Sequence, residues 1–119
     1  MRGIANIGEV GGEMLATAST PIRLRQIFGI DYFAIVTNKE VEEAKMLDLY
    51  SKLAFVMAKQ AEGADMNAVT VADFYDWLDQ FEPLDIALAV GEISKIYDRQ
   101  AMTTAKAKKA GGRQSGRTQ

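Results

Sequence analysis

Two aromatic segments, Thr20-Pro-Ile-Arg-Leu-Arg-Gln-Ile-Phe-Gly-Ile-Asp-Tyr-Phe33 and Phe74-Tyr-Asp-Trp-Leu-Asp-Gln-Phe-Glu-Pro-Leu-Asp85, set the architecture of this chain. Both predict short helices that bury aromatic side chains and end at a marked turn. Neither segment contains a catalytic constellation. These segments therefore predict a small helical protein that binds a partner rather than an enzyme.

The helix signals around the first segment are specific. Thr20 predicts an N-cap, and Pro21 fits the first helical turn because the amide hydrogen it lacks would be unpaired there. Gly29 predicts the end of this helix, and Asp31 predicts the cap of a second, short helix through Val36. The residues expected to face inward from the first helix are Ile22, Leu24 and Ile27.

The longest helix is predicted over residues 39–61. Asn38 is its expected cap, and the pair Glu62-Gly63 marks its end. Every residue from Leu53 to Ala58 is apolar, so this part must be covered on more than one side. Asp48 and Lys52 are spaced as an i,i+4 ion pair.

The second aromatic segment follows a capping box, because Thr70 is followed three residues later by Asp73. The predicted helix, residues 70–81, places four large apolar side chains on one broad face: Val71, Phe74, Trp77 and Phe81. Pro83 then starts a last helix, about residues 84–100, with an apolar stripe of Ile86, Val90, Ile93 and Tyr97. Gly91 within it suggests close packing against a neighbour, because glycine weakens a helix.

The glycine-rich start of the chain leaves two alternatives. Gly11-Gly12 is a turn signal between two short arms, residues 4–10 and 14–17, and predicts a β-hairpin. A frayed or helical start is the alternative. The predicted fold class is thus mainly α, a domain of about five helices over residues 1–102, with or without an N-terminal hairpin.

The last residues, 103–119, differ in composition from this domain. They carry five basic residues and no acid, a net charge of +5, whereas residues 1–102 carry a net charge of −7. They contain no large apolar side chain that could offset the entropy of ordering. We therefore predict a disordered basic tail.

The composition excludes most catalytic chemistry. The chain has no cysteine and no histidine, which removes thiolate nucleophiles, imidazole bases and most transition-metal sites. Three acids spaced by three residues, Asp73, Asp76 and Asp79, are interpreted as a solvated helix face rather than a cation site. We expect no catalytic residue, metal or cofactor, no membrane span, and a cytoplasmic location.

The three segments Ala16–Asp31, Leu53–Ala61 and Phe74–Phe81 together resemble the tail assembly chaperones of long-tailed phages and prophages of Gram-positive bacteria. The resemblance covers most of residues 14–98, and its most specific block is Phe74-Tyr-Asp-Trp-Leu-Asp-Gln-Phe81. The glycine-rich opening is looser than the short strand pair associated with that family.

The resemblance implies a mostly helical chaperone in the host cytoplasm that is absent from the finished virion. It implies binding of the tape measure protein, which is kept soluble while tail tube protein polymerises around it. It also implies that a longer form can be made by programmed ribosomal frameshifting. The oligomeric state stays open, a homo-oligomer included.

Four residues are the candidates for partner binding. Tyr75 and Trp77 are of the residue types enriched at interfaces, although Trp77 is also interpreted as a core anchor whose helix packs on the helix predicted over 39–61. Arg23 and Arg25 would flank a groove between the helix starting at Pro21 and the 70–81 helix, and would select acidic helices of the tape measure protein.

The alternative function is a small nucleic-acid-associated regulatory protein that uses the basic tail. Five bases without interleaved aromatic residues would give only weak, salt-sensitive and sequence-blind contacts with nucleic acid. We therefore rank this function second, and nucleic acid is not among the partners we expect.

The tail is predicted to be dispensable for folding, because it has almost no apolar area to pack. A chain ending at Met102 should melt within about two degrees of the full-length protein, since a ΔΔG below 1 kcal/mol shifts the melting temperature of a small domain only slightly. Circular dichroism at 222 nm is the measurement. A drop of several degrees would show that the tail docks on the domain.

Overall fold

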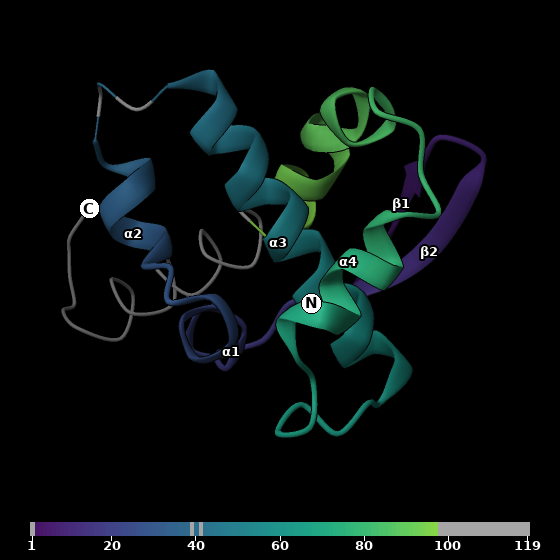
Figure 1. The fold of residues 1–119 in the computed structure, drawn as a ribbon, viewed down its shortest axis with the longest axis horizontal. Helices are drawn as coiled ribbons and strands as arrows, with labels where there is room; N and C mark the ends of the chain where they lie inside the picture. The colour runs from purple at the N-terminus through teal and green to yellow at the C-terminus, as the bar shows by residue number, and fades with distance from the viewer. Residues whose placement is uncertain (1, 39, 41, 98–119) are drawn as a thin grey trace, which may run out of the picture.

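The computed structural model describes residues 2–38, 40 and 42–97, and the side chains of Arg2 and Val10 are left out of that description. A two-stranded antiparallel hairpin is followed by helices that surround one long central helix (Figure 1). The elements are β1 (Arg2–Ile7), β2 (Val10–Leu15), α1 (Thr20–Phe28), α2 (Tyr32–Val36), α3 (Glu43–Glu62), α4 (Val71–Leu78) and a helical segment over 85–97.

The predicted fold class is confirmed: the described part of the chain is mainly helical, with five helices and an N-terminal β-hairpin. The predicted tail, residues 103–119, lies outside the described residues, as does the predicted end of the last helix. Within the described residues, no helix is both long and apolar enough to cross a membrane.

The hairpin turn lies three residues before the predicted position. Ile7 pairs with Val10, so the turn is Gly8-Glu9, and Gly11 and Gly12 lie within β2 opposite Asn6 and Ala5. Gly8 has a φ of +62°, a left-handed conformation that favours glycine. A Cβ at this position would also meet the carboxylate of Asp85, so that side chain would have to move. The prediction failed because two adjacent glycines are a stronger turn signal than one.

The core is built around α3. The five consecutive residues Leu53–Met57 have no solvent exposure. At 3.6 residues per turn, five consecutive side chains point in every direction around the helix, so α3 is enclosed on all sides at this level. β2, α1, α2 and α4 all contact it, and this confirms that the apolar run is covered on more than one side.

The start of α1 differs from the prediction in a way that matters for packing. The N-cap is Ser19, without a side-chain cap hydrogen bond, whereas Thr20 is fully buried. Thr20 Oγ1 donates a hydrogen bond of 2.7 Å to Gln60 Oε1, and Gln60 Nε2 donates one of 2.9 Å to Ser19 Oγ. The hydroxyl of Thr20 therefore ties α1 to the end of α3 instead of capping α1.

The inward face of α1 is narrower than predicted. Leu24 is fully buried and Ile27 packs against the core, but Ile22 is about half exposed, so its predicted inward orientation is wrong. The helix ends at Gly29, with a φ of +71°, as predicted. Asp31 caps α2 by accepting a hydrogen bond from the amide of Ala34, which is also as predicted.

The long helix begins later than residue 39. α3 starts at Glu43 after the N-cap Glu42, and Asn38 instead accepts a hydrogen bond from the amide of Glu40. The error arises because asparagine stabilises turns through the same side-chain contact that it uses in helix caps. At its other end, α3 finishes at Gly63 with a φ of +77°, as predicted.

The capping box of α4 is present, since Thr70 accepts from the amide of Asp73 and Asp73 accepts from the amide of Thr70. α4 ends at Leu78, earlier than the predicted residue 81. In the 85–97 segment, Ile86, Ile93 and Tyr97 are buried, whereas Val90 is partly exposed.

Gly91 does not lie at a close contact. A Cβ built on it would meet no atom within 4 Å of the described residues, and the residue is exposed. The predicted close packing of Gly91 against a neighbouring element of the chain is therefore wrong.

Replacing Gly91 with alanine should raise the free energy of unfolding by about 1 kcal/mol, because alanine favours the helix and finds open space. Urea denaturation measures this change. Gly12→Ala is the control: Gly12 also has open space but lies in a strand, where no helix-propensity gain applies. An unchanged or lowered stability of Gly91→Ala would contradict the open environment.

Candidate functional site

Aromatic side chains from three helices form one cluster on α3. Phe55 of α3 lies 5.5 Å from Phe74 and 5.7 Å from Trp77, between ring centroids, and Phe28 of α1 lies 5.1 Å from Phe74. These pairs have the edge-to-face geometry that aromatic rings favour. The cluster explains how α1, α3 and α4 are fixed together.

Trp77 belongs to this cluster and is only partly buried. Its ring lies 4.9 Å from that of Phe81 as well as against Phe55. α4 packs on α3 as the sequence predicts. Trp77 thus contributes to packing while leaving part of its ring at the surface, beside Ala58 and Met14 at the rim of a small hollow.

Tyr75 is the more exposed of the two aromatic candidates. Its side chain is 55% exposed, and its ring lies 5.3 Å from that of Phe74. It therefore extends the aromatic cluster toward solvent. Removing it would take away contact area for a partner and little internal packing.

The two arginines are not brought together. Arg23 donates a hydrogen bond of 2.7 Å to Asn67 in the loop between α3 and α4. Arg25 lines a shallow hollow with Asp31 and Phe33 at the α1–α2 junction. Two residues apart on a helix, the side chains leave in nearly opposite directions, so Arg23 and Arg25 do not flank one groove.

A surface that the sequence analysis missed lies between α3 and the 85–97 segment. A groove of about 530 Å³ is open there, lined mainly by apolar side chains of both elements: Ala44, Met46, Leu47, Tyr50, Ala87 and Val90, with Glu43 at its end. A second hollow of about 350 Å³ continues on the other side of Leu47, toward Phe81, Pro83 and Ile86. We call the two together the α3 groove.

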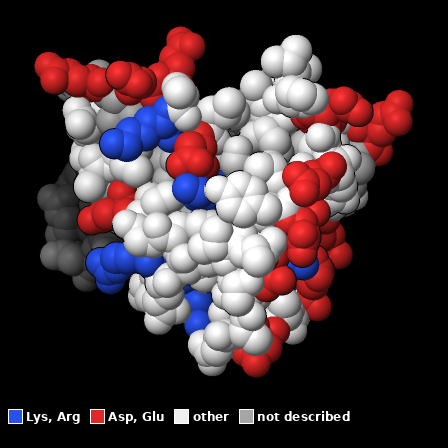
Figure 2. Space-filling view, in the orientation of Figure 1, with Lys and Arg blue, Asp and Glu red and all other residues white. Residues whose placement is uncertain are grey.

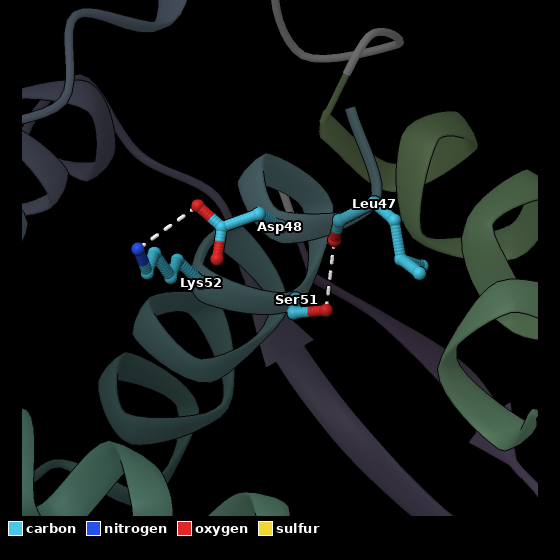
Figure 3. Close-up of polar contacts among 4 residues, drawn as sticks. All are labelled: Leu47, Asp48, Ser51 and Lys52. Atoms are coloured by element: carbon cyan, nitrogen blue, oxygen red, sulfur yellow. Dashed lines mark hydrogen bonds and ion pairs between the residues drawn. The ribbon is translucent and has the colours of Figure 1, made fainter. Parts of the chain in front are cut away.

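Leu47 stands where the two hollows meet. Figure 3 shows its side chain directed toward the last helix, while Asp48 and Lys52 form their 2.9 Å ion pair on another side of α3. Ser51, which lines the second hollow, directs its hydroxyl to the carbonyl of Leu47 at 2.8 Å. The floor of the α3 groove thus offers no free hydroxyl at Ser51 and is predominantly apolar.

Two exposed leucines lie close in sequence to the groove wall. Leu84 and Leu88 are 70% and 83% exposed, and the amide of Leu88 bonds to the carbonyl of Leu84 at 3.0 Å, which places them one turn apart on one face. Leu84 directly precedes the helical segment 85–97, and Leu88 follows Ala87 of the groove wall. Neither leucine lines a hollow, so both add exposed apolar area near the groove rather than inside it.

The α3 groove was missed for an identifiable reason. Leu47 and Val90 have the spacing of core residues, and sequence periodicity cannot tell which part of an apolar stripe stays uncovered. Leu84 and Leu88 were the available signal, because they lie off the stripe of Ile86, Val90, Ile93 and Tyr97.

The shape and lining of the α3 groove define what it could accommodate. An apolar groove can accept the apolar face of a helix. Among the described residues, no group of three or more acidic side chains is arranged to hold a metal ion. No protein family, curated protein or solved structure matches this chain.

Trp77→Ala and Tyr75→Ala form a matched pair that separates packing from surface contact. Because Trp77 is partly buried against Phe55 and Phe81, its truncation should lower the free energy of unfolding by about 2–3 kcal/mol. Tyr75→Ala should lower it by less than about 1 kcal/mol. Urea denaturation of both variants is the measurement. Equal losses would show that Trp77 makes no special contribution to the core.

Proposed function

We propose that this protein is a phage tail assembly chaperone that binds amphipathic helices of the tape measure protein and keeps that protein soluble. In this proposal the chain works in the host cytoplasm, catalyses nothing, uses no cofactor, and is absent from the mature virion. It hands the tape measure protein on as tail tube protein assembles.

The observation that carries the proposal is the α3 groove. Its walls are helices whose inner faces are fixed by the core, so the groove is a stable feature rather than a gap between loops. Its apolar lining and the adjacent Leu84 and Leu88 supply area that a partner helix would remove from water, at about 25 cal/mol per Å². A long, helical and apolar partner supplies such faces repeatedly.

The resemblance of three segments to tail assembly chaperones supplies the identity of the partner. Two of these segments, Leu53–Ala61 and Phe74–Phe81, build the core of the domain and its aromatic cluster. The resemblance therefore supports the assignment of the helical scaffold, and the α3 groove supports the proposed binding activity.

The rival function, a nucleic-acid-associated regulator, depends on residues 103–119, which lie outside the described residues. No lysine or arginine lines either hollow of the α3 groove. Retention on DNA that disappears on neutralising the tail bases would favour this rival.

Co-expression with a phage tape measure protein tests the proposal. The chaperone should raise the soluble fraction of the tape measure protein several-fold. Leu84→Ser combined with Leu88→Ser should abolish most of this gain, because the pair removes exposed apolar area without touching a buried residue.

Ile4→Ser is the control, since Ile4 is a comparably exposed apolar residue, at 67%, on β1, a strand that contributes no residue to either hollow. Arg23→Glu with Arg25→Glu tests the surface predicted from sequence in the same assay. A tape measure protein that stays insoluble with the unmodified chain would remove the main support for the proposal. If only the arginine variant loses the gain in soluble tape measure protein, the binding site lies on α1 and α4 instead of the α3 groove.

A further inference from the structure

We propose that the α3 groove selects helices that carry lysine or arginine beside their apolar stripe. This inference rests on the proposed function, because it specifies the kind of helix that the groove accepts. It is opposite in sign to the preference for acidic helices expected from Arg23 and Arg25.

The charge on the rim of the groove carries the inference. Three carboxylates line the two hollows: Glu43 at the start of α3, and Asp79 and Glu82 between α4 and the last helix. No base lines either hollow. Figure 2 shows acidic side chains gathered at the upper left and along the right of this face, with uncharged surface and a smaller number of basic side chains between them.

Each hollow has its own carboxylates. Glu43 lines the first hollow, Asp79 and Glu82 line the second, and Leu47 lines both. From Glu43 to Ser51 the α3 wall runs for about 12 Å. A bound helix would therefore place two to three turns in the groove, with bases at either end of its stripe within reach of carboxylates.

A second copy of this chain is a poor occupant of the groove. In a two-fold symmetric dimer the same surface patch meets itself, so Glu43, Asp79 and Glu82 would face the carboxylates of the other copy. Like charges across an interface oppose association. The rim therefore favours a partner of opposite charge.

The tail of the chain has the charge opposite to that of the groove's carboxylates, but it lacks large apolar side chains. Residues 103–119 contain five bases, but alanine is their largest aliphatic residue. Such a segment cannot fill a groove lined by Met46, Leu47 and Tyr50. The occupant that satisfies both charge and apolar lining is a cationic amphipathic helix of another protein.

Two synthetic helical peptides of roughly five turns test this inference on the full-length protein. They share one leucine stripe and differ only in the flanking residues, lysine in one and glutamate in the other. Isothermal titration calorimetry should show the lysine peptide binding about tenfold more tightly, about 1.4 kcal/mol, as expected for a few exposed ion pairs. The preference should shrink as salt is raised.

The decisive variant is Glu43→Gln with Asp79→Asn and Glu82→Gln. It should reduce the preference for the lysine peptide to less than about twofold, since the rim then has no charge to pair with. The control, Glu9→Gln with Glu62→Gln and Asp76→Asn, changes the net charge equally but at residues that line neither hollow. It should keep the tenfold preference.

Each other outcome overturns the inference in a different way. If both peptides bind equally and Leu47→Ser, in a residue that lines both hollows, weakens both, the α3 groove binds helices without selecting charge, and the proposed function stands. If neither peptide binds, or Leu47→Ser changes nothing, the groove is not the helix-binding site, which co-expression with a tape measure protein tests separately.

Two further measurements identify other occupants. A dimer in sedimentation velocity that Leu47→Ser dissociates would assign the groove to a second copy, since Leu47 lines both hollows. Tighter binding of the lysine peptide after Lys106→Gln, Lys108→Gln and Lys109→Gln would assign it to the tail. Either result would overturn the inference.

Discussion

The burial of residues Leu53–Met57 on every side of α3 is the constraint on which the rest of this structure depends. A helix that must hide more than one full turn of side chains needs covering elements all around it. The hairpin, α1, α2, α4 and the last helix share this work, and the aromatic cluster around Phe55 joins α1 and α4 to the same helix. The short helices are too short to be stable alone, so their structure depends on contact with α3.

The same constraint explains where the α3 groove lies. The buried part of α3 begins at Leu49, and most of the residues from Glu43 to Asp48 remain exposed. The first turns of α3 therefore extend beyond the covered core, next to a last helix whose inner face is already occupied by Ile86, Ile93 and Tyr97. Apolar side chains between the start of α3 and the last helix, Leu47 in particular, line a groove because no other described element covers them.

The sequence predicted the features that depend on neighbouring residues. Capping by Asp31 and Thr70 and the glycine ends at Gly29 and Gly63 involve contacts within a few positions, and all are present. Its errors involve contacts across the chain. From its neighbours alone, Thr20 is predicted to be a helix cap. Its hydroxyl instead donates a hydrogen bond to Gln60, forty residues later in the chain. The α3 groove could not be predicted either, because the spacing of Leu47 and Val90 is the same whether or not another element covers them.

The meeting of the two ends of the domain has a consequence for how it forms during synthesis. The side chain of Ile96 lies directly over Gly3, and the hairpin turn at Gly8 lies against Asp85. β1 is therefore made well before the residues that cover it, because its inner face is enclosed only by nearly the last described residues. Until then Ala5, Ile7 and Met14 have only part of their final cover. The nascent chain therefore passes through a stage in which the hairpin exposes an apolar surface.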